Sequence, residues 1–301
     1  MRIAVYLPLL ASMLLAAVCR PLASRVSPPT LIPALVLAGA LSALASTWGL
    51  ILLSATLLRV SPPVVERASA RALGLGGPVP NLVALVAALA LAVGSYRLAE
   101  TTHRRRTTLR VLRGVCQANA ASELVVIAAA EPHAVAVPTR GWGRGNIVVT
   151  SGMLAALDDQ ERSVLLAHER AHLRRGHHWA RVVVDAAAAL NPLLRPVRDT
   201  VAFLLERDAD EVAAEQVGSR TLAARSLARA ALATTDFPKP QTLAFERLGV
   251  TARVTALQSA RAPRGRLVAL AVAALGVATA LAATDATVAF TRLVEALIPG
   301  L

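Results

Sequence analysis

Hydrophobic residues occupy long unbroken blocks along this chain and do not alternate regularly with polar ones. A helix needs about 20 predominantly apolar residues to cross a lipid bilayer. The first block could also be a signal peptide, because Arg2 precedes it, but the further apolar blocks favour a first membrane span. The pattern predicts an α-helical membrane protein with about four transmembrane helices, over residues 3–19, 31–58, 79–98 and 267–284.

A long polar segment separates the third apolar block from the fourth, and it is large enough to form a soluble domain. After the fourth block, charged residues interrupt the apolar pattern, which predicts an interfacial helix or a short exposed end. The predicted divisions are a three-helix membrane region, a soluble domain, and a fourth helix with a short tail, over residues 1–99, 100–266 and 267–301.

Within the polar segment, β-branched runs precede amphipathic stretches, which predicts an α+β domain. The expected strands cover residues 122–129, 133–137 and 146–152, with a glycine-rich turn over residues 140–145. A helix follows, which Asp158 or Asp159 can cap with Glu161 as the capping partner, and Gly176 is a plausible end. Two more helices are expected, over residues 185–190 and 197–217.

Arginine supplies nearly all of the positive charge, and the 32 basic residues exceed the 19 acidic ones to give a net charge of +13. The arginines cluster beside the apolar blocks, which favours a membrane protein over direct nucleic acid binding. The positive-inside rule then places the polar segment in the cytoplasm and both termini outside. Arg20 and Arg25 agree with this orientation, whereas Arg59, Arg67 and Arg71 fall on the opposite side.

Four of the six histidines lie between residues 165 and 178, and three residues there spell His-Glu-x-x-His: His168, Glu169 and His172. Residues four apart on a helix share one face, so both imidazoles can reach a single zinc ion. The Glu169 carboxylate would flank the metal and act as general base toward water that zinc has acidified. A chance match of this short motif is the alternative, and the capped helix argues against it.

A catalytic zinc usually takes three protein ligands, so a third must come from elsewhere in the chain. The two cysteines are distant and cannot supply a thiolate cluster. His103 and His133 are possible but lie upstream, whereas Glu206 and Asp210 lie one turn apart on a downstream helix. Glu206 could bind zinc and Asp210 could accept the outward N–H of a ligating histidine. The plain alternative is an acidic, solvated helix face.

The stretch "IVVTSGMLAALDDQERSVLLAHERAHLRRGHHW", followed by "ERDADEVA", resembles the integral membrane zinc peptidases of the gluzincin type. The similar groups are the BlaR/MecR antirepressor peptidases and the HtpX-like and CAAX-processing membrane endopeptidases. The resemblance covers residues 146–217. It implies a zincin-like metallopeptidase domain in which His168, His172 and Glu206 bind Zn²⁺, Glu169 is the base, and Asp210 supports a ligand.

The order of three spans, a zinc domain and one span is similar to the BlaR/MecR arrangement, although no large extracellular sensor domain follows the last block. The resemblance implies a multi-pass protein of the bacterial cell membrane that cleaves a cytosolic regulator, such as a winged-helix transcriptional repressor. HtpX-like quality control of membrane proteins is one alternative. A non-catalytic membrane receptor or scaffold is another.

Peptide hydrolysis also needs a group that stabilises the oxyanion. Both tyrosines lie in predicted spans, so an arginine or a histidine would have to serve. His177 and Arg207 are the candidates for an oxyanion or substrate contact. For His177 the plainer interpretation is an exposed side chain at a helix end, where it suits the helix dipole.

Overall fold

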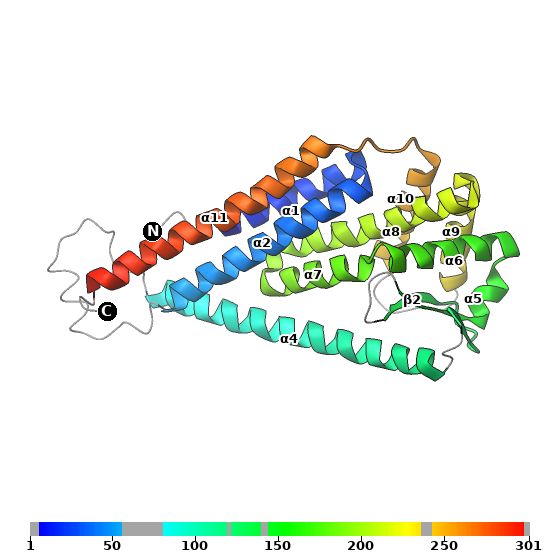
Figure 1. Cartoon of the computed structure of the whole chain (residues 1–301), viewed down its shortest axis with the longest axis horizontal. Coiled ribbons are helices and arrows are strands. Elements are labelled where there is room, and N and C mark those ends of the chain that lie inside the picture. Colours follow the sequence, from blue (N-terminus) through cyan, green and yellow to red (C-terminus); the bar gives the residue numbers. More distant parts are fainter. Residues whose placement is uncertain (1–5, 56–80, 119–121, 140–143, 236–242, 298–301) are drawn as a thin grey trace.

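The computed structural model describes residues 6–55, 81–118, 122–139, 144–235 and 243–297. Long helices form an elongated bundle, and a small sheet with shorter helices lies at one end of it (Figure 1). The arginines at positions 59, 67 and 71 and most of the glycine-rich turn, residues 140–143, lie outside the described residues.

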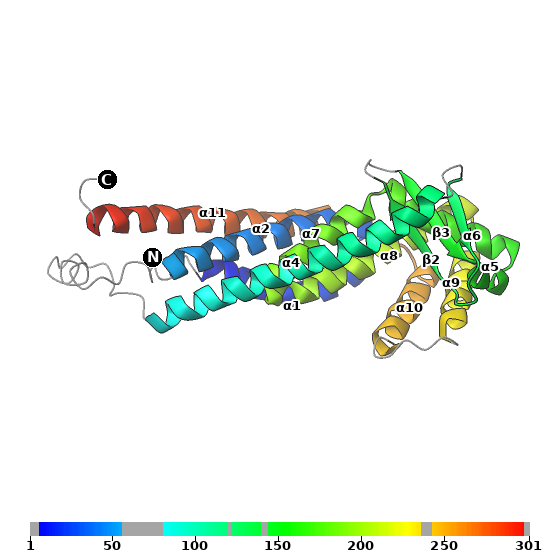
Figure 2. The same ribbon diagram turned by 90° about the horizontal axis from the view of Figure 1, so that it is seen from below.

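Among the described residues, four helices are long enough and apolar enough to cross a membrane, in agreement with the predicted number. They are α1 (Leu7–Arg25), α2 (Pro28–Ala55), α4 (Asn81–Ala118) and α11 (Arg266–Leu297). The sheet lies at the end of the bundle where α1 ends and α11 begins (Figures 1 and 2). Arg20, Arg25 and Arg266 are therefore at the same end of the bundle as the sheet.

Two of these helices continue past their apolar blocks. Helix α4 runs on through the arginine-rich segment to Ala118, and α11 runs through Asp285 to Leu297. Helical hydrogen bonds do not require apolar side chains, and neither segment contains the proline that would end a helix. Residues 285–297, predicted as an interfacial helix or a short exposed end, thus continue the last helix beyond its candidate span, which ends at Asp285.

The sheet has three strands in the order β1-β3-β2: β1 (Leu124–Ile127), β2 (Ala134–Pro138) and β3 (Gly145–Thr150). This confirms the three predicted strands. Strand β3 pairs in parallel with β1 and antiparallel with β2. Ile147, Val148 and Val149 are buried because β3 is the central strand. In the described part of the chain, β2 lies at one edge of the sheet.

The remaining helices follow the sheet: α5 (Ser151–Ala156), α6 (Asp159–Arg174), α7 (His177–Leu190), the 3-10 turn η2 (Pro192–Leu194), α8 (Arg195–Val217), α9 (Arg220–Thr235) and α10 (Leu243–Gln258). Helix α6 begins with the predicted capping box, in which Asp158 accepts from the Glu161 amide and Glu161 accepts from the Asp158 amide. Helix α8 ends at Val217, and the following Gly218 has a φ of 72°. Helix α7 begins eight residues earlier than the predicted start at residue 185.

Helices α7 and α8 pack beside the candidate spans. The largest apolar core of the described residues contains side chains from α7 and α8 and from these spans. Leu15 and Cys19 from α1, Leu35 from α2, and Val197 and Val201 from α8 belong to this one cluster. Apolar side chains exclude water only when a partner surface covers them, and here the spans are that partner. Residues of α7 and α8, which lie inside the predicted division 100–266, thus share an apolar core with the candidate spans.

Candidate metal centre

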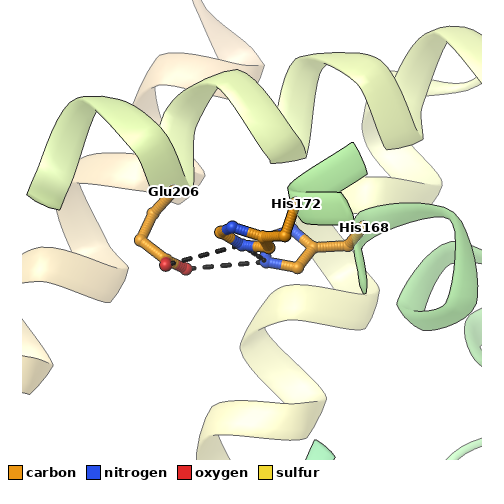
Figure 3. A group of neighbouring side chains, drawn as sticks. All are labelled: His168, His172 and Glu206. Carbon is orange, nitrogen blue, oxygen red and sulfur yellow. Dashed lines mark hydrogen bonds and ion pairs between the residues drawn. The ribbon is translucent and has the colours of Figure 1, made fainter. Parts of the chain in front are cut away.

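Helices α6 and α8 bring together the two motif histidines and the downstream glutamate. The Nε2 atoms of His168 and His172 lie 3.1 Å apart. The Glu206 carboxylate oxygens lie 3.5 Å from His168 Nε2 and 3.6 Å from His172 Nε2. Figure 3 shows the three side chains converging from two helices.

These separations fit a zinc site. Ligand atoms about 2.1 Å from one ion at tetrahedral angles lie about 3.4 Å from one another. The observed distances between the Nε2 and Oε atoms bracket that value. Two imidazoles and one carboxylate are also a donor set that zinc accepts. His168, His172 and Glu206 can therefore hold one zinc ion and leave a coordination position open.

A carboxylate and an arginine support this cluster from behind. Asp210, one turn after Glu206, has its Oδ1 3.0 Å from Nδ1 of His168. Arg253 of α10 donates to both Asp210 oxygens at 2.7 Å, and its NH1 group lies 3.1 Å from Glu206. Asp210 thus orients His168 so that Nε2 faces the cluster, and Arg253 holds the two carboxylates in place.

Electrostatics at the site favour a cation. Burial opposes charge on His168, but the hydrogen bonds that its ring nitrogens donate to Asp210 and Glu206 outweigh it and raise the pKa of His168 to about 10. Burial and the neighbouring charge on His168 lower the pKa of His172 to about 3. Against the effect of burial, the hydrogen bond with His168 and the charge of Arg253 hold the pKa of Glu206 below its usual range. The surroundings therefore stabilise a positive charge beside Glu206, which is what a metal ion supplies.

Glu169 lies next to the cluster without belonging to it. Its side chain is buried, and it lines the same cavity as His168 and Glu206. Burial raises the pKa of Glu169, with a further contribution from the Glu206 charge. A carboxylate whose pKa is raised toward neutrality is a better proton acceptor for catalysis near neutral pH.

A cavity of about 240 Å³ opens onto Glu169 and the cluster. One wall is the edge of the sheet at β2, with Pro132, His133 and Ala134. Much of the rest is apolar and comes from α5, α6, α8 and α9. The apolar side chains are Met153, Leu157, Val164, Leu165, Ala213, Ala223, Leu227 and Ala230. The cavity therefore combines the polar side chains of the cluster with a largely apolar wall.

The two residues that the sequence offers for an oxyanion or substrate contact lie elsewhere. His177 is 5% exposed and faces His172 and Asp208, because the chain turns back at Gly176. Arg207 donates to the carbonyl oxygen of Ala23 in α1. His177 is thus not the exposed side chain expected at a helix end, and neither residue is part of the cavity wall.

The sequence pattern did not reveal Arg253 or Asp208 as residues of the site. Arg253 follows Asp210 by 43 positions, with no short motif between them. The sequence offered one signal, because two carboxylates one turn apart on a helix that also packs in a core call for a cation nearby. Nothing in the local sequence says which arginine supplies it. His103 is exposed on α4 and outside the cluster, whereas His133 lines the cavity.

Comparison with known proteins gives one result that bears on this geometry. No curated protein and no solved structure matches the chain. Residues 99–195 match the family described as Peptidase family M48, whose metallopeptidases are typically zinc-dependent. The matched segment includes His168, Glu169 and His172 and ends before Glu206. The chain is thus similar over residues 99–195 to the M48 metallopeptidases, in agreement with the metal cluster and the candidate spans.

Proposed function

We propose that this chain is a membrane-embedded zinc endopeptidase that hydrolyses peptide bonds with activated water. The observation that carries the proposal is the convergence of His168, His172 and Glu206, with ligand-atom separations of 3.1 to 3.6 Å, beside the buried Glu169. The similarity to peptidase family M48 supports the same reaction class.

The roles of the residues follow from their positions. When bound by the three ligands, zinc would acidify water and polarise the scissile carbonyl group. Glu169 would take a proton from the attacking water and deliver it to the leaving amine, which conserves the proton through the reaction. Asp210 and Arg253 would keep His168 and Glu206 in place while the charge changes.

The cavity suggests how substrate binds. An extended peptide can add to the exposed edge of a sheet through main-chain hydrogen bonds, and β2 offers such an edge beside the cluster. The apolar wall formed by residues such as Leu157, Val164 and Leu227 would take an apolar side chain next to the scissile bond. We therefore propose an unfolded or extended protein segment with an apolar residue at the cleavage position as the substrate.

The proposed orientation places the catalytic end in the cytoplasm, since Arg20, Arg25 and Arg266 lie at that end of the bundle. The physiological substrate would then be a cytosolic regulator, such as a winged-helix transcriptional repressor, as in BlaR/MecR-like peptidases. Co-expression of the chain with a repressor encoded beside it tests this: loss of the full-length repressor supports the regulatory role. Cleavage only of misfolded membrane proteins would favour the HtpX-like role instead.

The substitution Glu169→Gln tests the reaction itself. The variant should keep its zinc, because Glu169 is not a ligand, and should lose about 10²–10⁴-fold of cleavage rate on an unfolded protein substrate. Zinc is measured by elemental analysis of the purified chain. Glu215→Gln, at an exposed position late in α8, is the matched control and should cleave at the rate of the unaltered chain. Unchanged cleavage by the Glu169 variant would remove this residue from the mechanism, and absence of cleavage by any form would favour a receptor or scaffold.

A further inference from the structure

Behind His172 lies a second buried histidine whose position the metal cluster alone does not explain. Nδ1 of His172 lies 3.0 Å from Nδ1 of His177. Nε2 of His177 lies 3.1 Å from Oδ2 of Asp208. His177 is 5% exposed and Asp208 is 3% exposed. Arg175 donates a hydrogen bond of 3.0 Å to the other carboxylate oxygen of Asp208. These residues form one continuous hydrogen-bonded row that ends on a candidate ligand.

Local structure explains how the row forms. Helix α6 ends at Arg174, and Gly176 has a φ of 62°, a left-handed conformation that glycine adopts without strain. The chain reverses there, so that His177, the first residue of α7, returns to the side of His172. Asp208 follows Glu206 by two positions on α8, which places the two carboxylates about 200° apart around the helix axis. Glu206 therefore faces the cluster while Asp208 faces the start of α7.

The direction of each hydrogen bond follows from the chemistry of the ligand. If His172 binds the metal through Nε2, its Nδ1 carries the proton and must donate. Nδ1 of His177 is then the acceptor, so His177 carries its own proton on Nε2 and donates it to Asp208. Each nitrogen and oxygen atom in the row is then either a donor or an acceptor. No other placement of the protons satisfies all of the contacts with His172 as a neutral ligand.

We propose that His177 and Asp208 are positioning residues that fix the ring orientation and tautomer of His172 for metal binding. This inference rests on the proposed zinc site. It also gives the two histidine ligands equivalent support: a carboxylate backs each one, and an arginine holds each carboxylate. Asp210 contacts His168 directly, whereas His177 bridges the greater distance between His172 and Asp208. His177 is not a fourth ligand, because its Nδ1 meets the outward nitrogen of His172.

Zinc affinity of the purified full-length chain tests the proposal without relying on activity. The substitution His177→Phe keeps the ring volume and removes both hydrogen bonds. Loss of a group that orients a metal ligand typically weakens metal binding by about 10–100-fold. We expect a decrease of that size in competition with a chromophoric chelator. The substitution His177→Gln retains one acceptor and one donor in the amide and should recover most of the affinity.

Two more measurements distinguish positioning from packing. Asp208→Asn preserves the shape and removes the negative charge, so it should weaken zinc binding less than His177→Phe does. In the cobalt-substituted protein, His177→Phe should alter the visible absorption bands, because they report the ligand geometry. His103→Phe, at an exposed position on α4, is the control and should change neither the affinity nor the spectrum.

The outcomes separate this inference from the proposed function. Tight zinc binding by the unaltered chain, with equal affinity in the His177→Phe variant, would overturn the positioning role and leave the proposed function intact. A failure of the unaltered chain to bind zinc would overturn the proposed function itself. Equal losses in the Phe and Gln variants, with an unchanged cobalt spectrum, would also overturn the positioning role, because neither the hydrogen bonds of His177 nor the ligand geometry would then account for the loss.

Discussion

The two halves of helix α8 differ in what surrounds them. The first half packs Val197, Val201 and Leu204 into the apolar core shared with α1 and α2. The second half carries Glu206, Asp208 and Asp210, whose carboxylates contact residues of α6, α7 and α10. One continuous helix therefore joins the bundle of candidate spans to the metal centre.

This difference teaches that the position of the site depends on the bundle. A helix is stiff over a few turns because each backbone group is held by its own hydrogen bonds. A shift of the first half against α1 and α2 would therefore move Glu206 relative to the two histidines on α6. Asn191, just before α8, reinforces the first half by donating to Ser12 of α1 and Ser46 of α2 at 2.9 and 3.1 Å.

The largest effect in this comparison is expected from Arg253, which lies on α10 and contacts the second half of α8. The substitution Arg253→Met leaves the carboxylates of Asp210, which is buried, and of Glu206, which is partly exposed, without their cation. Zinc affinity should fall by about 10–100-fold, since both His168 and Glu206 lose their support. Chelator competition measures this change.

Arg261→Met is the matched control for that experiment. Arg261 pairs with Glu211 and Glu215 farther along α8, but its side chain is 55% exposed, so its ion pairs contribute little. An equal loss of zinc affinity in both variants would show that Arg253 has no special role at the cluster.

The pH dependence of the thermal stability of the metal-free protein should also report on the second half of α8. The folded-state pKa of His168 is raised to about 10 from its usual 6.5. Its proton therefore contributes stability that is fully present below about pH 6.5 and is lost as pH rises through about 10. The thermal midpoint of the metal-free chain should fall over that range, by roughly 2–4 °C for each kcal/mol lost. Zinc loading should remove this dependence, since the ion replaces the proton.

The substitution His168→Gln tests the assignment of that pH dependence, because glutamine does not titrate. Its thermal midpoint should vary less between pH 6.5 and 10 than that of the unaltered metal-free chain. An identical slope in both proteins would assign the dependence to another group.

The smallest effect on the metal centre is expected from Asn191, which supports the first half of α8. Asn191 is 4% exposed, and Asn191→Ala would leave Ser12 and Ser46 without their donor. The cost should be about 1–3 kcal/mol in the free energy of unfolding, measured by denaturant titration in detergent. The zinc affinity should stay within about threefold, because the variant keeps every residue of the cluster. A loss of zinc as large as that in Arg253→Met would mean that the bundle controls the site far more strongly than local contacts do.

Much of the architecture could be predicted from the sequence because it follows from short-range rules. Unbroken apolar blocks gave the number of spans, and β-branched runs gave the three strands. The pair Asp158 and Glu161 marked the start of the helix that carries His168 and His172. Each of these signals lies within one contiguous stretch of chain, where backbone geometry alone decides which side chains share a face.

Other features could be decided only by the tertiary structure. The sequence determined that His168 and His172 share a helix face and that Glu206 and Asp210 share another, because both pairs are four apart. Packing decided that these faces meet, that Arg253 completes the carboxylate pair, and that His177 turns toward His172. These contacts join residues on different helices, and their distances depend on how apolar surfaces from the whole chain fit together, which local spacing does not encode.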